Sequence, residues 1–139
     1  MNRKASAHWE GTLKEGKGHL TTQSTILSKT QYSFKTRFEQ GAGTNPEELI
    51  AAAHAGCFTM QVGAVLTQAG LNPLSLDTEA TLDFDMAVPV IKGIHLELTG
   101  KVPGLTNEKF QEIAKGAKEN CIISRVLNTA ISMNATLVS

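Results

Sequence analysis

The sequence predicts a single α+β domain covering residues 1–139. Two blocks of alternating apolar and polar residues, within 5–38 and 76–102, predict strands, because successive side chains of a strand point to opposite faces of a sheet. Between them, residues 46–69 are apolar, rich in small side chains and without this alternation, which indicates a helix. The order of strands, helix, strands, helix and strand is typical of the α+β class. A length of 139 residues, with 41% apolar and 19% charged residues, fits one globular domain.

The first block predicts an antiparallel meander of three strands. Small or apolar side chains alternate with polar ones over residues 5–13, and the glycines within 15–18 supply a turn. A hairpin into residues 19–27 is therefore expected. We expect the third strand over residues 32–38.

A loop with two glycines leads into the predicted long helix. Asn45 is a suitable N-cap, Pro46 suits the first helical position, and Glu48 completes a pattern similar to a capping box. The helix is expected to run to about Ala69 and to end at Gly70. Because small residues lie on nearly all its sides, we expect burial on several sides with other backbones close against it.

The remaining chain predicts a second set of strands and a second helix. The expected elements are strands within 76–86 and 94–102, a helix capped by Thr106 or Asn107, a short helical piece near 124–129, and a strand around 133–137. The core face of the second helix is expected to hold Phe110, Ile113, Ala114 and Ala117.

Charge and composition argue against several classes of function. Thirteen basic and thirteen acidic residues cancel, whereas a nucleic-acid-binding protein is expected to show a basic excess. No apolar run is expected to approach the roughly 18 residues of a membrane helix, and the N-terminus lacks the apolar segment of a signal peptide. We therefore predict a cytoplasmic protein without nucleic-acid or membrane partners.

Two cysteines, Cys57 and Cys121, are the candidate reactive groups. Each is also compatible with an inert buried thiol, and their separation of 64 positions (121 − 57) leaves open whether they meet. If they meet, one thiolate can attack an oxidant and the other can resolve the sulfenic acid as a disulfide. A reactive thiolate needs positive charge nearby, for which Arg37 is the candidate. Glu47 or Glu48 is expected either to hold this arginine or to complement the helix dipole.

The spacing of Glu47 and Cys57 bears on the oligomeric state. Ten positions (57 − 47) correspond to about 15 Å along an unbroken helix, too far for one tight site. Either the helix is broken between them, or the glutamate serves a cysteine of a second subunit. A helix lined with small residues suits the close approach of a partner chain, so we predict a pocket at a homodimer interface.

Three segments of the chain resemble the OsmC branch of the OsmC/Ohr family. They read Arg37-Phe38-Glu39, Gly43-Thr44-Asn45-Pro46-Glu47-Glu48-Leu49 and Ala52-Ala53-His54-Ala55-Gly56-Cys57-Phe58. The resemblance extends to Pro103-Gly104 and the late cysteine, so it covers essentially the whole chain. It implies an OsmC-like fold, in which antiparallel strands pack around a long central helix, and an intertwined homodimer.

The resemblance also implies a thiol-dependent peroxidase of organic hydroperoxides and hydrogen peroxide, acting in oxidative stress defence. Cys57 is then the peroxidatic nucleophile and Cys121 the resolving thiol. Arg37 stabilises the thiolate and polarises the peroxide, and Glu47 orients Arg37. The family uses no metal or prosthetic group, and an external dithiol, suggested to be lipoyl-type, is the reductant. This chain has Ile122 where the family motif has proline after the late cysteine, which frees a backbone N–H and relaxes the turn.

Other interpretations remain open at this point. His54, three residues before Cys57, allows a Cys/His hydrolase or acyl transferase, although no orienting group is evident beside it. A metal-binding module would use His54 and the two cysteines with His8, His19 or His95, which are scattered. A non-catalytic thiol redox sensor would form the Cys57–Cys121 bridge without turnover. Apolar neighbours (Phe58, Met60 and Ile122) are either pocket lining or core, and core is preferred for Met60.

Overall fold

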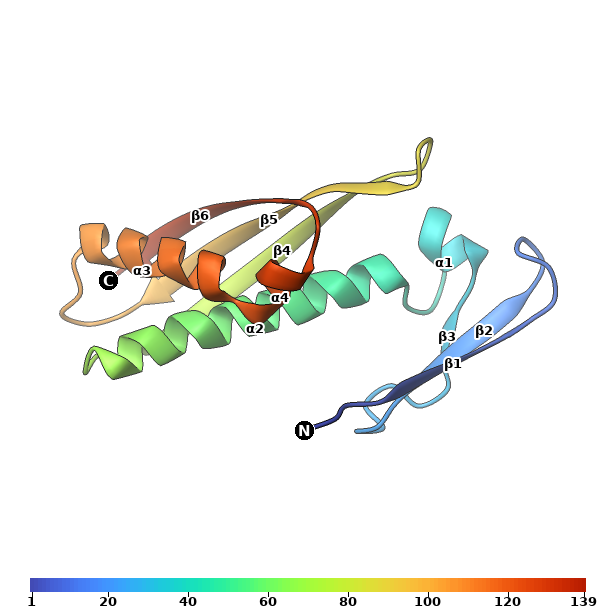
Figure 1. Cartoon of the computed structure of the whole chain (residues 1–139), viewed down its shortest axis with the longest axis horizontal. Helices are drawn as coiled ribbons and strands as arrows, with labels where there is room; N and C mark the ends of the chain where they lie inside the picture. The colour runs from blue at the N-terminus through green and yellow to red at the C-terminus, as the bar shows by residue number, and fades with distance from the viewer. The chain divides into compact units, whose positions relative to one another are not determined.

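Two separate three-stranded sheets contain the strands of the chain, and helices follow each of them. The computed structural model describes all residues, Met1–Ser139, which divide into two compact units, Met1–Leu49 and Ile50–Ser139 (Figure 1). Each unit contains one of the sheets. The predicted α+β class is confirmed.

The N-terminal unit is built on an antiparallel meander. Strands β1 (Ala5–Glu10), β2 (Lys17–Thr22) and β3 (Thr30–Tyr32) pair in that order, as the alternation predicts. The second strand ends at Thr22, before the predicted residue 27, and a turn follows in which the Thr25 N–H donates to the Thr22 carbonyl at 2.9 Å.

The prediction of a third strand over residues 32–38 is wrong beyond Tyr32. The segment instead forms helix α1 (Phe34–Phe38), and Ser33 caps it. The Thr36 N–H donates to Ser33 Oγ at 3.3 Å, and the Ser33 N–H donates to Thr36 Oγ1 at 2.8 Å, which closes a reciprocal capping box. Phe34 and Phe38 are spaced for a strand face but also for one helix face, and their ring centroids lie 4.8 Å apart.

The long helix begins at the predicted residue but differs from the prediction in its cap. Helix α2 (Pro46–Gln68) is continuous, and the Glu48 N–H donates to Asn45 Oδ1 at 2.7 Å. The predicted capping box does not form, because the Glu48 carboxylate accepts from Thr44 Oγ1 at 3.0 Å. Asn45 Nδ2 also donates to the Thr36 carbonyl at 3.0 Å, which ties α1 to the start of α2.

The helix ends at the predicted glycine. Gly70 has φ +74°, which favours a residue without Cβ, and its N–H donates to the Thr67 carbonyl at 3.0 Å. The Leu71 N–H donates to the Leu66 carbonyl at 2.9 Å, which completes a Schellman motif.

The second unit contains a mixed sheet with strand order β4-β5-β6. Strands β4 (Ser75–Asp85) and β5 (Val90–Lys101) are antiparallel, whereas β6 (Ala130–Val138) runs parallel to β5. This parallel pair departs from the expectation of antiparallel strands throughout. It follows from the connection, because helices α3 (Asn107–Asn120) and α4 (Ile122–Val126) carry the chain back across the sheet before β6 begins.

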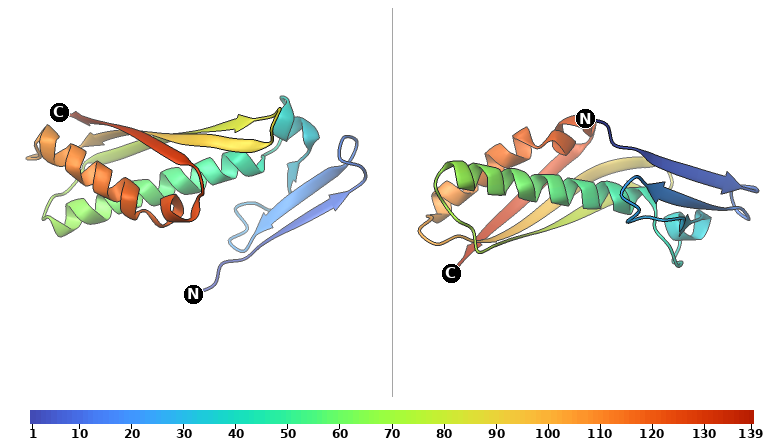
Figure 2. Two further views of the ribbon diagram at one scale, coloured as in Figure 1. Left: turned by 45° about the horizontal axis from the view of Figure 1, so that its top comes forward. Right: turned by 90° about the horizontal axis from the view of Figure 1, so that it is seen from below.

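Helices α2 and α3 cover the same face of this mixed sheet (Figure 2). The core between them combines residues of α2, β5 and α3, and the predicted face of α3 is confirmed as buried. Gly100 allows the close approach of α3, since a Cβ there would lie 2.5 Å from Phe110 Cζ. The fully buried core residues are Phe58, Val62, Leu66, Leu96, Leu98, Phe110, Ala114, Ala117 and Cys121.

Within the chain, α2 is buried on one face rather than on several as predicted. Its buried residues are His54, Phe58, Val62 and Leu66, whereas Met60 is 78% exposed and the preference for Met60 as core is wrong. The expectation that no apolar run approaches the length of a membrane helix is wrong for α2, which by length and composition alone is apolar enough to cross a membrane. Core helices of soluble proteins pass the same test.

Candidate active site

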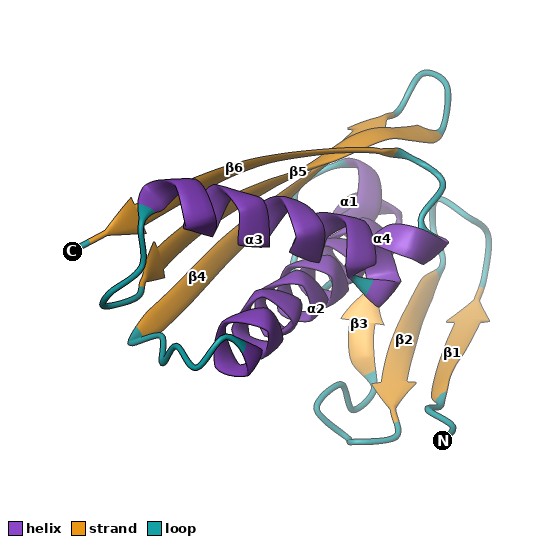
Figure 3. Cartoon of the chain, turned by 60° about the vertical axis from the view of Figure 1, so that its left-hand side comes forward, coloured by secondary structure: helices purple, strands orange, loops and turns teal.

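Cys57 and Cys121 come together in the second unit. Cys57 lies on α2, Cys121 lies at the junction of α3 and α4, and their sulfur atoms are 3.0 Å apart (Figure 3 shows the elements). Both are free thiols; Cys57 is partly exposed and Cys121 is 0% exposed. A disulfide requires about 2.05 Å between the sulfurs, so a shift of about 1 Å joins them. An incoming oxidant reaches Cys57 before Cys121.

The junction at Cys121 brings backbone donors to both sulfurs. The Cys121 N–H donates to the Ala117 carbonyl at 2.8 Å, and the chain then turns into the short helix α4. The first residues of α4 consequently direct their N–H groups toward the thiols: those of Ile122 and Ile123 toward Cys57, and those of Ile123 and Ser124 toward Cys121. The Ile122 N–H is one that a proline at this position would lack.

The pKa of the Cys57 thiol lies above its usual range. Burial is the main cause, and the hydrogen bond with Cys121 adds to the rise. The N–H groups of Ile123 and Ile122 act in the opposite direction without cancelling it. Cys57 therefore needs an additional positive group to be a thiolate near neutral pH.

The pKa of Cys121 lies below its usual range although the residue is buried. Burial raises this pKa, but hydrogen bonds from the Cys57 thiol and from the backbone and side chain of Ser124 outweigh it. Because the two sulfurs are in contact, the protonation of each thiol affects the pKa of the other.

Arg37 and Glu47 form a second pair, in the N-terminal unit. Arg37 Nη2 and Nε donate to Glu47 Oε1 at 2.8 and 3.0 Å, so the carboxylate fixes two guanidinium nitrogens. The Arg37 guanidinium also lies 5.2 Å from the centroid of the Phe38 ring. Arg37 lies on α1, not at the end of a strand as predicted. Of the two glutamates considered, Glu47 holds Arg37 in this way and Glu48 pairs with Thr44.

His54 has a partner that sequence reasoning missed. Its Nε2 lies 2.7 Å from Ser124 Oγ, whereas its Nδ1 is buried and has no hydrogen-bond partner. His54 therefore makes no hydrogen bond with Cys57, which removes the geometric support for a Cys/His hydrolase. His54 and Ser124 are 70 positions apart, and no motif in the sequence links them.

Burial lowers the pKa of His54, which makes stability dependent on pH. The unfolded chain takes up a proton at this site below a pKa of about 6.5, while the folded chain resists it. Unfolding therefore becomes more favourable as pH falls through that value. We expect the melting temperature of wild type to fall between about pH 7.5 and about pH 5, and His54→Gln to show a smaller fall. An identical fall in both proteins would contradict the assignment.

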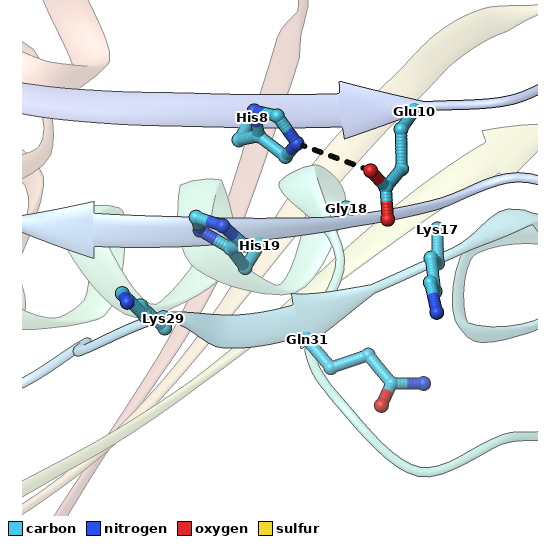
Figure 4. Close-up of a pocket in the computed structure, with 7 residues that line it drawn as sticks. All are labelled: His8, Glu10, Lys17, Gly18, His19, Lys29 and Gln31. Atoms are coloured by element: carbon cyan, nitrogen blue, oxygen red, sulfur yellow. Dashed lines mark ion pairs between the residues drawn. The ribbon is translucent and has the colours of Figure 1, made fainter.

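The histidines proposed for a metal site are not gathered around the cysteines. No group of three or more His, Cys, Asp or Glu side chains is arranged to hold a metal ion. His8 and His19 instead stack across β1 and β2 with ring centroids 5.0 Å apart, beside Glu10 (Figure 4). They line an open hollow of about 240 Å³ that holds no thiol and includes Lys17 and Lys29.

The two thiols in contact within this α+β fold have the arrangement that dithiol redox proteins use. A sequence model of the OsmC-like protein family matches residues 39–136, which include Glu47 and both cysteines. The chain is 43% identical to peroxiredoxin OsmC of Escherichia coli (strain K12), covering 100% of this chain and 99% of the relative. The chain therefore belongs to the OsmC family.

More distant relatives agree with this assignment. An organic hydroperoxide resistance protein of Xanthomonas axonopodis pv. citri is 34% identical over 70% of this chain and 68% of its own. Among solved structures, an OsmC-like protein from Mycoplasma pneumoniae matches with TM-score 0.76 at 13% identity, covering 100% of this chain and 99% of its own. This similarity shows the fold.

Proposed function

We propose that this chain is a thiol peroxidase that reduces organic hydroperoxides and hydrogen peroxide in oxidative stress defence. The observation that carries the proposal is the 3.0 Å approach of two free thiols, of which Cys57 is partly exposed and Cys121 buried. This arrangement suits an accessible nucleophile that reacts with the oxidant and a buried second thiol that then forms the disulfide with it. The names of the relatives, peroxiredoxin and organic hydroperoxide resistance protein, support the same chemistry.

The first step oxidises Cys57. Its thiolate attacks the distal oxygen of the peroxide, the S–O bond forms as the O–O bond breaks, and the alkoxide leaves and takes up a proton to become the alcohol. Arg37 stabilises the thiolate and the charge on the departing alkoxide. Glu47 orients Arg37 through the paired hydrogen bonds to its guanidinium.

The second step forms the disulfide. The Cys121 thiolate attacks the sulfenic sulfur of Cys57, the S–S bond forms, and hydroxide leaves and is protonated to water. An external dithiol then reduces the disulfide by thiol–disulfide exchange. We take this reductant to be lipoyl-type, with neither a metal nor a prosthetic group taking part.

The exposed face of α2 supports a homodimer with the pocket at its interface. Ala53, Gly56, Met60 and Ala64 form an apolar stripe along the helix opposite its buried residues, and all are exposed in the single chain. A second copy of α2 can approach such small side chains closely. Because α2 is continuous, Glu47 stands about 15 Å along the helix from Cys57. Arg37 and Glu47 therefore act on Cys57 of the partner subunit.

The number of cysteines supports a cytoplasmic location. Two cysteines in 139 residues are too few for the disulfide-stapled scaffold of a small secreted domain. No nucleic acid or membrane takes part in the proposed reaction.

Peroxide consumption and mass spectrometry test the proposal together. With excess dithiol, wild type is expected to consume a hydroperoxide continuously, and one equivalent of peroxide without reductant is expected to give a Cys57–Cys121 disulfide with the mass of two hydrogens lost. Cys121→Ser is expected to gain one oxygen at Cys57, which a 1,3-diketone traps as sulfenic acid. With a monothiol as reductant, this variant is expected to depend on the external thiol for resolution.

The alternatives predict different results. A thiol redox sensor forms the disulfide but shows no sustained peroxide consumption with excess dithiol. A hydrolase keeps its turnover of an ester in Cys121→Ser without any reductant. Either result would overturn the peroxidase.

A further inference from the structure

A chain of hydrogen-bonded side chains crosses the face of the mixed sheet that lies opposite α2 and α3 (Figure 2). His95 and Glu97 alternate with core residues of β5, and Ser132 and Asn134 of β6 pair with them in register. Ser132 Oγ lies 2.8 Å from His95 Nδ1, and His95 Nε2 lies 3.1 Å from Glu97 Oε2. Asn134 Nδ2 donates to the same carboxylate oxygen at 3.1 Å. A hydroxyl, an imidazole and a carboxylate are therefore linked in that order.

The direction of each hydrogen bond follows from what the groups can donate. A carboxylate only accepts, so the neutral His95 ring carries its hydrogen on Nε2, toward Glu97. Nδ1 is then the acceptor, and the Ser132 hydroxyl donates to it. The contact of Asn134 Nδ2 with His95 Nε2 is longer, at 3.5 Å, and leaves this assignment unchanged. Hydrogen bonds from His95 and Asn134 lower the pKa of Glu97, which keeps the carboxylate ionised near neutral pH.

This order of groups is one that activates a nucleophile, because a base contacts the hydroxyl and a third group orients the base. His95 Nδ1 is placed to take the Ser132 proton, and the Glu97 carboxylate then stabilises the imidazolium. Ser132 is exposed and His95 is partly exposed, so a reagent reaches the hydroxyl from solvent. Thr136, on the same face of β6, instead lies opposite Thr99. The peroxidase steps use none of these residues.

We propose that Ser132, with His95 as its base and Glu97 as the positioning residue, is a site of acylation by small activated acyl donors such as aryl esters and thioesters. The Ser132 oxygen attacks the carbonyl carbon, a C–O bond forms, and the hydroxyl proton passes to His95 Nδ1. The bond to the phenolate or thiolate breaks, and this group leaves without taking up a proton, so activated donors suit the site. The imidazolium then releases its proton to water. The product is an alkyl ester whose alkoxide leaves poorly, so the acyl group stays on Ser132.

The test uses the full chain with both thiols removed by Cys57→Ser and Cys121→Ser, because cysteines also react with activated esters. Para-nitrophenyl acetate is the probe: the release of para-nitrophenolate is followed by absorption, and peptide masses locate each acetyl group. Hydroxylamine removes acetyl from a serine ester but not from a lysine amide. We expect one hydroxylamine-sensitive acetyl group on the peptide that contains Ser132. Because neither thiol takes part, the result is independent of the proposed peroxidase.

Variants in this background separate base-assisted acylation from the reactivity of an exposed hydroxyl. His95→Gln keeps a polar side chain but removes the base, and it is expected to slow acylation of Ser132 by about tenfold or more. Glu97→Gln removes the charge that stabilises the imidazolium and should slow acylation by about threefold or more. Thr136→Ser is the matched control, since it provides a second serine on β6 that lies opposite Thr99 rather than a histidine. Acylation at position 136 is expected to be about tenfold slower than at Ser132 in the same molecule.

Three outcomes would overturn the proposal. Equal acylation at Ser132 and at position 136 would show that both hydroxyls react merely as exposed serines, and this comparison is made within one molecule. An unchanged rate at Ser132 in His95→Gln would remove the base. Undiminished release of para-nitrophenolate in Ser132→Ala would remove Ser132 as the nucleophile and assign the reaction to another group. Circular dichroism and melting curves confirm that each variant folds.

Discussion

Replacing Cys57 with serine is expected to lower peroxide consumption by roughly a thousandfold or more, because a serine hydroxyl is neither ionised near neutral pH nor a comparable nucleophile. The change replaces one sulfur with a smaller oxygen. It therefore removes the reactive thiol beside Cys121 and leaves the packing there nearly unchanged. The measurement is the hydroperoxide remaining after timed incubation with excess dithiol. The same samples are assayed for disulfide by mass.

Cys121→Ser is the matched control, since it makes the same atomic change 3.0 Å away. Without reductant, this variant should still reduce one equivalent of peroxide and stop at the sulfenic acid, whereas Cys57→Ser should reduce none. Circular dichroism should show the same helix and strand content in both. Retention of more than about a tenth of wild-type turnover in Cys57→Ser would remove Cys57 as the peroxidatic residue.

The sequence predicted best where local chemistry decides the structure. Asn45, Pro46 and Gly70 fixed both ends of α2 because caps and positive-φ glycines act through neighbouring backbone atoms. It failed over residues 34–38, where alternation and helical spacing coincide for two phenylalanines. There the hydrogen bonds between Ser33 and Thr36 cap and stabilise the helix.

Contacts between distant segments could not be predicted from spacing. The pairing of Arg37 with Glu47 was one of two options. In the structure the Thr44 hydroxyl donates to the Glu48 carboxylate, and Arg37 donates to Glu47. The link from His54 to Ser124 depends on how α4 packs on α2, which no local pattern encodes. The exposure of Met60 was misjudged for a related reason: the apolar composition of α2 does not distinguish its buried face from its exposed one.

The environment of Cys57 bears on the role proposed for Arg37. Burial and the neighbouring thiol raise the pKa of Cys57, and the N–H groups of Ile122 and Ile123 compensate in part. The guanidinium held by Glu47 is the group proposed to complete the compensation. Which subunit supplies it can be decided by mixing two inactive variants.

Arg37→Gln and Cys57→Ser are each expected to be nearly inactive, with a loss of about a hundredfold or more for Arg37→Gln because its positive charge acts on the thiolate and the leaving alkoxide. When the two chains are co-expressed in equal amounts, we expect peroxide consumption to recover to about a quarter of the wild-type rate. Half of the dimers are then mixed, and one of the two sites in each mixed dimer combines the intact Arg37 of one subunit with the intact Cys57 of the other.

Lys35→Gln is the control for this experiment, because it removes one positive charge from an exposed position on the same short helix. It should keep wild-type activity within about twofold. If Arg37 served the cysteine of its own chain, every site in a mixed dimer would lack one of the two groups, and the mixture would be no more active than its parents. Recovery of activity therefore requires that the arginine cross the interface, and its absence would contradict a shared site.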